Sequence, residues 1–583
     1  MLHTLTRSLR ENKGPALVTV LLSALEVVFE IVIALFMSNL IDFGIEGGSM
    51  AAVWKFGAFL LLLAAFQLAT GVLAARIAAR ASVGFAANLR EDMYNNVQTF
   101  AFSNIDKFST ASIVTRLTTD TTNVQNAFQM LMRMAIRSPV MLIFSMIVSF
   151  RISCDISMTF LVILPILALA LFFIIRSVFP VFSRVFRTYD ELNNVVQENV
   201  RGIRVVKSFN QERHEIGKFG AISERIYKDF SKGERLITLN APLMQFCIYT
   251  CMIVISWLGA KAIIASGNDP ALGLTTGNLT ALITYTMQIL SSLMMLSMVF
   301  AMLTISLSSA RRIAEVLEER TDIPQPAQPV MTVRDGTVDF DHVSFVYASK
   351  ADKKVLDDID LHIRSGETIG VIGGTGASKS SLVQLIPRLY DVTGGKLTLG
   401  GVDVRDYDLD TLRGAVAMVL QKNELFSGTI AENLRWGNEN ATDEQLRHAC
   451  KLACADGFIS AMPDGYDTHI EQGGTNVSGG QKQRLCIARA LLKKPKVLIL
   501  DDSTSAVDTR TDAQIQQALS TYIPDTTKII IAQRISSVQN ADRIVVLDDG
   551  HIDAVGSHDE LLRTCEIYRE VYESQQKGGE DDA

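Results

Sequence analysis

The chemistry of this chain centres on a glycine-rich turn suited to holding phosphate groups. Its sequence runs Val371-Ile372-Gly373-Gly374-Thr375-Gly376-Ala377-Ser378-Lys379-Ser380-Ser381. The turn follows a strand-like run, Ile363 to Ile372, and opens a helical pattern of apolar residues at positions 382, 385, 386 and 389. Glycines let backbone amides curl around an anion, and a helix N-terminus adds partial positive charge. Lys379 would then reach the β- and γ-phosphates of a nucleotide, and the Ser380 hydroxyl would ligate Mg²⁺.

Position 378 departs from the phosphate-loop pattern G-x-x-x-x-G-K-[ST]. Ser378 stands where the second glycine is expected. Taken alone, the segment is therefore also compatible with an ordinary turn between a strand and a helix. Because the backbone amide of Ser378 is retained, we expect nucleotide binding to survive with an altered loop geometry.

Other segments favour a nucleotide site. The run Val497-Leu498-Ile499-Leu500-Asp501 is typical of a buried strand that ends in a carboxylate, the Walker B arrangement for Mg²⁺. Tyr347 offers a ring on which adenine can stack, and Gln421 follows an apolar strand at 416–420. The run Ser505-Ala506-Val507-Asp508 comes shortly after Walker B. A Ser478-Gly479-Gly480 turn opens a helix upstream of Walker B and predicts a second anion site.

The composition points to a membrane component. Of 583 residues, 48% are hydrophobic, and the chain is too long for a single core. The net charge of −7 lacks the excess of positive charge that is typical of proteins that bind nucleic acid. The seven cysteines include no C-x-x-C pair, so we expect them to be small buried hydrophobic side chains rather than metal ligands or disulfides.

The N-terminal half contains six apolar runs, each long enough to cross a bilayer as a helix. They lie near residues 15–41, 57–79, 130–150, 157–179, 243–265 and 279–305. The short connectors between runs one and two (42–50) and between runs five and six (265–278) contain no Lys or Arg, whereas the N-terminus and the long connectors, 80–129 and 180–242, are rich in both. The positive-inside rule therefore predicts a cell-membrane protein with both termini and both long connectors in the cytoplasm. The long connectors are themselves helically patterned, so we expect helices that continue past the membrane.

Two carboxylates lie inside the first span. Glu26 and Glu30 are four residues apart and so share one helix face. Carboxylates within a bilayer are costly and usually face an internal cavity. They either provide a counter-charge for a cationic substrate or form an ion pair with Arg133 or Arg137 in the third span.

A methionine stripe marks the sixth span, where Met287, Met294, Met298 and Met302 recur on one helix face. Thioether side chains are soft and unbranched, so they suit a surface that accepts varied apolar ligands. The same stripe is also compatible with simple packing.

Prolines at positions 324, 326 and 329 separate the two halves of the chain. We predict a multi-domain protein in which an all-α, six-helix transmembrane domain precedes an α/β P-loop NTPase domain. The predicted bounds are 1–312 for the membrane domain, 313–330 for a linker, 331–575 for the nucleotide-binding domain and 576–583 for a polar tail.

These motifs and their order resemble those of ATP-binding cassette (ABC) exporter half-transporters over the whole chain. The segment Val477–Gln481, which matches the family's signature, is the most specific feature. The resemblance implies a type IV ABC exporter fold and a pair of half-transporters in the lipid bilayer. Two nucleotides would lie at their interface, each held by the Walker loops of one subunit and the signature of the other. Coupling helices would lie near residues 104–112 and 197–209.

The resemblance also assigns roles to site residues. ATP would be contacted by Tyr347, Gly373, Thr375, Gly376, Ala377, Ser378, Lys379, Ser380 and Ser381. Mg²⁺ would be held by Ser380, Gln421 and Asp501. The ATP of the partner's site would be contacted by Ser478, Gly479, Gly480 and Gln481, with Asp508 in the D-loop. Hydrolysis would involve Gln421, Asp502 and Gln533, and a substrate cavity would include Glu26, Glu30, Met287, Met294 and Met298.

Two departures from the family affect hydrolysis. Asp502 stands where the family has the glutamate that polarises the attacking water. Aspartate is one methylene shorter, so its carboxylate falls short by about 1.5 Å, and a misplacement of about 1 Å can cost on the order of a hundredfold in rate. Gln533 replaces the family's switch histidine and cannot carry its charge or proton. The alternative is neutral drift in a working homodimer.

The pattern resembles the degenerate-site subunit of heterodimeric bacterial multidrug exporters. It implies slow hydrolysis at this chain's own Walker site and a different half-transporter as partner, with small amphipathic molecules as substrates. The alternatives are an exporter of a lipid or peptide, and an ATP-gated sensing membrane protein with little transport.

Overall fold

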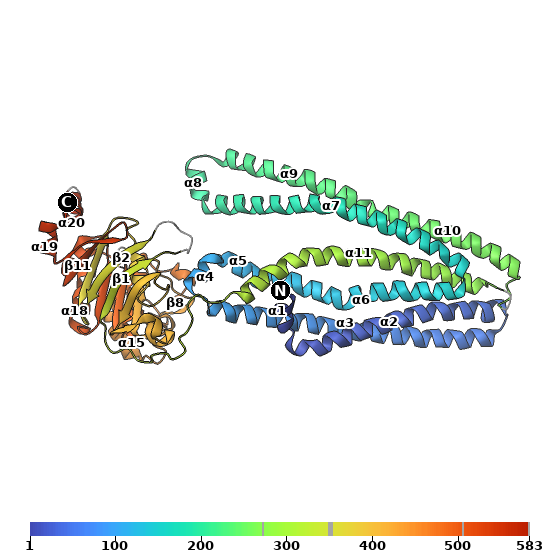
Figure 1. The fold of residues 1–583 in the computed structure, drawn as a ribbon, viewed down its shortest axis with the longest axis horizontal. Coiled ribbons are helices and arrows are strands. Elements are labelled where there is room, and N and C mark those ends of the chain that lie inside the picture. The colour runs from blue at the N-terminus through green and yellow to red at the C-terminus, as the bar shows by residue number, and fades with distance from the viewer. Residues whose placement is uncertain (271–272, 348–353, 504–506, 581–583) are drawn as a thin grey trace. The chain divides into compact units, whose positions relative to one another are not determined.

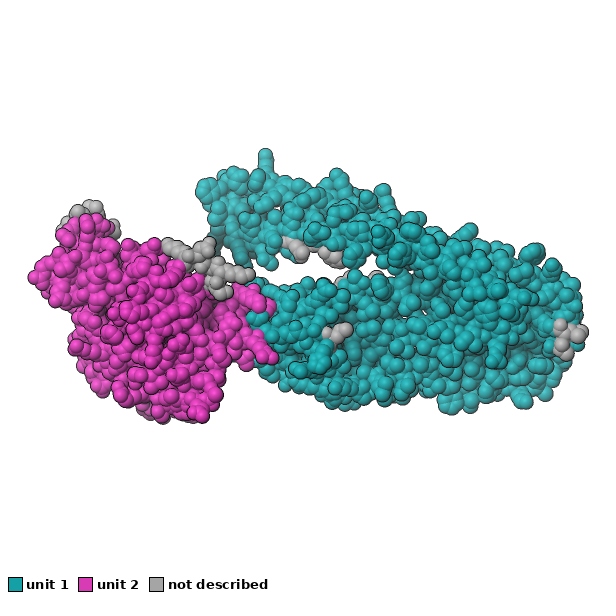
Figure 2. Space-filling model, in the orientation of Figure 1, with its two compact units in different colours: residues 1–98, 109–319 teal, residues 99–108, 320–583 magenta. Residues whose placement is uncertain are grey.

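The structure is a computed structural model that describes residues 1–270, 273–347, 354–503 and 507–580. It contains two compact units, one formed by Met1–Gln98 and Ser109–Glu319, the other by Thr99–Phe108 and Arg320–Ala583 (Figure 2). The short segment 99–108 therefore belongs to the second unit although it lies between membrane helices in the sequence.

The first unit is a bundle of long helices (Figure 1). In chain order these are α1 (Leu2–Arg7), η1 (Arg10–Asn12), α2 (Lys13–Asn39), η2 (Leu40–Glu46), α3 (Met50–Gln98), α5 (Thr110–Thr115), η3 (Arg116–Asp120), α6 (Thr121–Ile152), α7 (Cys154–Arg201), α8 (Ile203–Ser208), α9 (Glu212–Thr238), α10 (Asn240–Ser266) and α11 (Thr276–Glu318). Among the described residues, six helical segments are long and apolar enough to cross a membrane. Each contains one predicted run, so the prediction of six spans is confirmed.

Several helices extend well past any membrane. The 49 residues of α3 would span about 70 Å at the usual rise per residue, against roughly 30 Å of hydrocarbon. The extensions of α7 and α9 lie side by side in Figure 1 and are joined by an ion pair between Arg225 and Glu191. The short helix α8 follows α7 and precedes α9. The side chains of Ile203 and Val205 on α8, and of Phe209 directly after it, are exposed. The prediction of helical connectors is confirmed.

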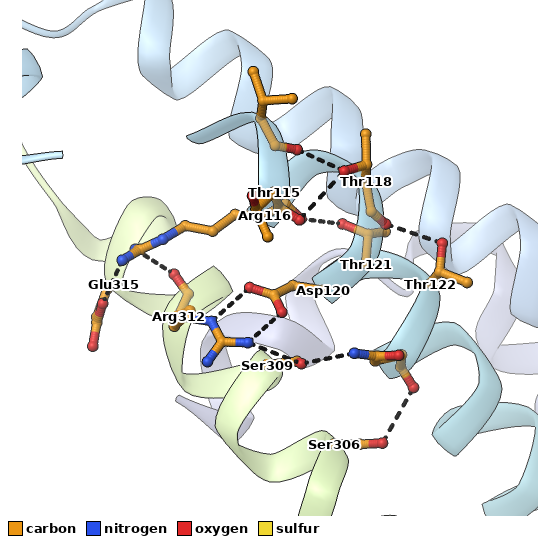
Figure 3. Close-up of polar contacts among 12 residues, drawn as sticks. Thr115, Arg116, Thr118, Asp120, Thr121, Thr122, Ser306, Ser309, Arg312 and Glu315 are labelled. Atoms are coloured by element: carbon orange, nitrogen blue, oxygen red, sulfur yellow. Dashed lines mark hydrogen bonds and ion pairs between the residues drawn. The ribbon is translucent and has the colours of Figure 1, made fainter. Parts of the chain in front are cut away.

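A polar network ties the start of α6 to the end of α11 (Figure 3). The Arg312 guanidinium donates to both carboxylate oxygens of Asp120, at 2.7 and 2.5 Å. Asp120 lies in the π-helical turn η3 and is 1% exposed. Arg116, one turn earlier, donates to the Arg312 carbonyl at 2.7 Å and pairs with Glu315 at 3.1 Å. A buried carboxylate needs a counter-charge, so this network fixes the end of α11 against η3.

Removal of the Asp120 carboxylate should destabilise the protein, because the Arg312 guanidinium would lose a bidentate partner. We expect Asp120→Asn to cost about 1–3 kcal/mol, seen as a lower Tm of the detergent-solubilised chain. Glu315→Gln removes the negative charge of a side chain that is 58% exposed and should cost at most about 0.5 kcal/mol. Equal losses in the two variants would contradict the dominant role of the buried pair.

The second unit is an α/β domain. Its strands are β1 (Val338–Phe345), β2 (Leu356–Ile363), β3 (Thr368–Gly373), β4 (Gly394–Leu399), β5 (Val402–Asp403), β6 (Val416–Val419), β7 (Gly428–Thr429), β8 (His469–Ile470), β9 (Val497–Asp501), β10 (Thr527–Ile531), β11 (Arg543–Asp548) and β12 (His551–Gly556). Its helices are α4 (Phe102–Lys107), α12 (Lys379–Gln384), η4 (Val404–Asp406), α13 (Leu409–Ala415), α14 (Ile430–Arg435), α15 (Asp443–Leu452), α16 (Asp456–Ser460), η5 (Gly465–Asp467), η6 (Gln472–Gly474), α17 (Gly479–Leu492), α18 (Thr509–Tyr522), η7 (Ile535–Ser537), α19 (His558–Thr564) and α20 (Glu566–Glu580).

The main sheet has the order β12-β11-β3-β10-β9-β6, with β12 antiparallel and the other strands parallel. Every residue of β9 and β10 is buried. Strands that are buried along their whole length and mostly apolar are typical of a parallel sheet covered on both faces. A second, antiparallel sheet, β2-β1-β4-β5, shares a hydrophobic core with one face of the main sheet. The predicted fold class is therefore confirmed.

Two details of the prediction are wrong. The run from Ile363 to Ile372 is not one strand, because the chain turns at Gly366, whose φ of +82° favours glycine. The helix after the phosphate loop ends at Gln384 and does not reach Leu389. Pro387 disfavours helical geometry at the residue before it and so limits the helix.

The ends of the predicted segments also differ from the structure. The helix α11 continues to Glu318, so the predicted linker begins inside it. The helix α20 extends through Glu580, so most of the predicted tail is helical. The described cysteines are free, but Cys154 is exposed and Cys454 is half-buried, so the expectation of burial fails for these two.

Candidate nucleotide site

The phosphate loop connects β3 to α12. A Cβ added to Gly373 would lie 2.3 Å from the Leu547 carbonyl oxygen, so no larger residue fits at the start of the loop. Gly376 has φ +88° and Ser378 has φ +66°. Two left-handed residues let the intervening amides turn toward a common centre, as an anion site requires. Ser378 thus keeps the backbone conformation that a glycine would adopt there.

Lys379 lies across the mouth of this loop. Its Nζ donates to the carbonyl oxygens of Gly373 at 2.8 Å and Gly374 at 2.9 Å. Burial lowers the pKa of Lys379 below its usual value, and the charges of Asp501 and Asp502 oppose that shift. The ammonium is therefore poised beside the loop, where phosphate oxygens can replace the two carbonyls as acceptors.

Asp501 ends strand β9 and is 4% exposed. Burial raises the pKa of its carboxyl, while a hydrogen bond with Ser380 and the charge of Lys379 act in the opposite direction. A hydroxyl and a carboxylate in direct contact beside a phosphate loop form a hard-oxygen set that fits Mg²⁺. We infer that Ser380 and Asp501 would hold this ion, which would neutralise phosphate charge.

Three polar side chains meet next to this pair. Asp502 Oδ2 accepts from Gln533 Nε2 at 2.8 Å and from Gln421 Nε2 at 3.3 Å. Asp502 has φ +47°, a left-handed conformation that aspartate tolerates better than most residues. The three residues follow β9, β10 and β6, which are neighbours in the sheet. The structure thus brings together the residues to which the sequence assigns hydrolysis.

An aromatic cluster borders the loop. The Tyr347 hydroxyl hydrogen-bonds to Ser381 at 2.8 Å, and its ring, 46% exposed, makes edge contacts with Phe345 and Tyr390. The exposed ring remains available for stacking on adenine. Tyr390 was not identified from the sequence, because a single tyrosine three residues after Pro387 belongs to no recognisable motif.

Tyr390 also reaches α4, which overlaps one of the regions expected to hold coupling helices, 104–112. The Tyr390 hydroxyl donates to Asp106 at 2.8 Å, and its ring meets Phe102 edge-on at 6.0 Å. Asn104 is 1% exposed and donates to the Arg320 carbonyl at 3.0 Å. These contacts anchor α4 to the nucleotide-binding unit.

The second glycine turn forms the N-terminus of α17. The Ser478 side chain accepts from the Gln481 amide at 3.3 Å, while the Gln481 side chain accepts from the Ser478 amide at 2.9 Å. This capping box fixes the first turn of a 14-residue helix. Ser478 and Gly479 are exposed. The turn therefore presents a helix N-terminus to an anion that approaches from outside the chain.

Asp508 caps α18 by accepting from the Thr511 amide at 2.9 Å. The preceding residues of the predicted D-loop, Ser505 and Ala506, lie outside the described residues. Asp508 therefore holds a structural role in this chain, and its expected contact with a partner subunit stays a prediction.

The membrane residues adopt one of the two expected arrangements. Arg137 on α6 pairs with Glu26 at 2.7 Å and with Glu30 at 2.7 Å, both on α2. The ion pair that was expected as the alternative to a substrate contact therefore forms. In it, the Arg137 guanidinium binds both carboxylates. On α11 the predicted stripe residues Met287, Met294 and Met298 are all exposed.

A six-helix membrane domain followed by a P-loop domain with a second anion site defines a half-transporter driven by ATP. Two family matches agree with that class. The family described as "ABC transporter transmembrane region" matches residues 16–294, and the family described as "ABC transporter" matches residues 356–505.

Individual proteins extend the comparison. The chain is 35% identical over 561 residues to the uncharacterized ABC transporter ATP-binding protein YfiB of Bacillus subtilis, covering 96% of each protein. It is 34% identical over 541 residues to the uncharacterized ABC transporter ATP-binding protein Rv1273c of Mycobacterium tuberculosis, covering 92% of this chain and 91% of that one. A solved bacterial Atm1-family ABC exporter with ATP bound shares the fold with a TM-score of 0.80 at 24% identity, covering 97% of this chain and 98% of the other. The chain belongs to the ABC transporter family.

Substitutions at position 378 should change ATP affinity according to the strain that they create. Ser378→Gly removes a left-handed penalty of roughly 1 kcal/mol and should bind ATP as tightly or up to about fivefold more tightly. Ser378→Val places a β-branched residue in the same conformation and should bind at least about tenfold more weakly. Calorimetric titration of the full-length protein with ATP in EDTA measures both. Equal affinities for Gly and Val would contradict the left-handed conformation.

Proposed function

We propose that this chain is the degenerate-site subunit of a heterodimeric exporter in the cell membrane, with both termini in the cytoplasm. Its own Walker site binds ATP with Mg²⁺ and hydrolyses it slowly. Its signature turn completes the hydrolytic site on a second, different half-transporter. The substrates are small amphipathic molecules that carry positive charge.

The hydrogen bond between Asp502 and Gln533 is the observation that carries this proposal. A general base must present a free oxygen to the attacking water. Here one of the two Asp502 carboxylate oxygens, Oδ2, already accepts from two amides, at 2.8 and 3.3 Å. The shorter side chain places the carboxylate farther from the water, and an amide cannot hold the proton that a histidine holds. Both replacements weaken hydrolysis, whereas Lys379, Ser380 and Asp501 remain suited to binding.

The intact signature supports the second half of the proposal. Ser478 and Gly479 lie exposed at a well-capped helix start. A chain that had drifted out of use would not be expected to keep this turn while losing only hydrolytic groups. The asymmetry therefore favours a working complex over general decay.

The membrane residues support a cationic substrate. When ionised, Glu26 and Glu30 carry two negative charges and Arg137 carries one positive charge, so this group of three side chains has a net charge of −1. An uncompensated charge in a bilayer is costly, and a cationic ligand would relieve that cost. The exposed methionines Met287 and Met298 offer an adaptable apolar surface for the rest of such a molecule.

ATPase measurements test the division of labour. The chain purified alone should turn over ATP poorly, whereas the complex isolated through a tag on this chain should be active. Replacing the glutamate after Walker B of the partner by glutamine should reduce turnover at least about a hundredfold, whereas Asp502→Asn should reduce it only slightly. Brisk turnover by the chain alone, or equal collapse in both variants, would falsify the proposal.

Transport into vesicles tests the substrate class. Glu30→Gln leaves Glu26 and Arg137 as a balanced pair, so the affinity for a cationic dye should fall by about fivefold, while transport of a neutral dye should not change. The neutral dye serves as the control for folding and insertion. Transport of a labelled phospholipid in place of either dye would support the lipid-exporter alternative.

A further inference from the structure

The C-terminal helix α20 contacts the segment that carries Gln533. Gln575 on this helix donates from Nε2 to the Gln533 carbonyl oxygen at 2.8 Å. Its Oε1 accepts from the Ile535 amide at 2.9 Å. One side-chain amide thus bridges the peptide groups on both sides of Arg534. We call this contact the α20 bridge.

The α20 bridge begins where the parallel sheet ends. Strand β10 ends at Ile531, and the Ala532 amide still donates to the Val371 carbonyl at 3.3 Å. Beyond this point Arg534 is extended, with φ −97° and ψ 129°. An extended segment that has left a sheet needs other partners for its peptide groups. Gln575 supplies both a donor and an acceptor there.

The backbone carbonyl of Gln533 accepts a hydrogen bond from Gln575, whereas the side chain of Gln533 acts as a donor. Its amide donates to Asp502 at 2.8 Å, and Asp502 also accepts from Gln421. The direction of a side chain is set by its backbone, so a held carbonyl at position 533 restricts where its amide can reach. A continuous series of contacts therefore runs from α20 through Gln533 to Walker B.

We propose that Gln575 is a positioning residue that, through the α20 bridge, orients Gln533 toward the γ-phosphate of ATP bound at this chain's own Walker loop. Gln575 does not touch the nucleotide itself. This inference rests on the proposed function, which places Gln533 in this chain's own slow ATP site, and it adds the contact of Gln533 with the γ-phosphate. It adds that the C-terminal helix sets how firmly the slow site retains ATP.

The test measures ATP retention in the complex purified through a tag on this chain and held in lipid nanodiscs. The complex is loaded with radiolabelled ATP and Mg²⁺ and then diluted into unlabelled ATP. Gln575→Met keeps the side-chain length but cannot supply the paired amide groups. Loss of two neutral hydrogen bonds should speed ATP release by roughly three- to tenfold. Gln575→Glu keeps the acceptor for Ile535 and should give an intermediate rate.

The neighbouring Gln576 provides a matched control. Its amide donates to the Tyr572 hydroxyl on the same helix at 2.6 Å. Gln576→Met should therefore release ATP at the rate of the unmodified protein. If Gln575→Met and Gln576→Met behave alike, the positioning role is overturned.

A double-mutant cycle separates positioning from general stabilisation. Gln533→Ala should speed ATP release, and adding Gln575→Met to it should change nothing further, because Gln575 acts through Gln533. Additive effects would overturn the positioning role while leaving the proposed function intact. No effect of Gln533→Ala on retention would overturn the contact of Gln533 with the γ-phosphate and with it the positioning role, while the slow hydrolysis of the proposed function is tested separately by the ATPase measurements.

Discussion

The nucleotide site depends on the order of four parallel strands. The strands β3, β10, β9 and β6 are neighbours, and each ends at the same edge of the sheet. The phosphate loop, Gln533, Asp501 with Asp502, and Gln421 follow these strands in turn. Ligands bind at the carboxyl ends of parallel strands because the loops there converge. Gln421 and Gln533, which are 81 and 31 residues from Asp502 in the sequence, therefore both meet it within hydrogen-bond distance.

Backbone conformation explains why the substitutions at this site are tolerated. Ser378 and Asp502 both have positive φ, at +66° and +47°. Such residues carry a local cost that the surrounding structure must offset, and they concentrate at functional sites. Serine and aspartate have short polar side chains, which limits the free-energy cost of their positive φ. The loop amides therefore stay in place. The site can thus differ from the family pattern at positions 378 and 502 while its loop keeps a geometry suited to phosphate.

Polar contacts between elements that are distant in the chain hold the functional segments on each unit. In the membrane unit, Asp120 and Arg312 fix the end of α11, and Arg137 joins α2 to α6 through both glutamates. In the nucleotide-binding unit, Tyr390 holds α4 and Gln575 holds the segment after β10. Each contact joins elements that are distant in the chain, so each restricts motion more than a local hydrogen bond would. None of these partners follows from a motif.

The sequence by itself determined the six spans, the α/β domain and the position of the phosphate loop between a strand and a helix. Apolar runs of about 20 residues and glycines at fixed spacing report local physical requirements that do not depend on the rest of the fold. The prediction of secondary structure from the sequence failed at Gly366 and Pro387, where a single residue divided an apolar pattern into shorter elements. Only the tertiary structure decided that Arg137 pairs with both Glu26 and Glu30, that Gln533 donates to Asp502, and that Gln575 holds the backbone beneath it. Those pairings depend on which helices and strands become neighbours, and neighbourhood is a property of packing rather than of local pattern.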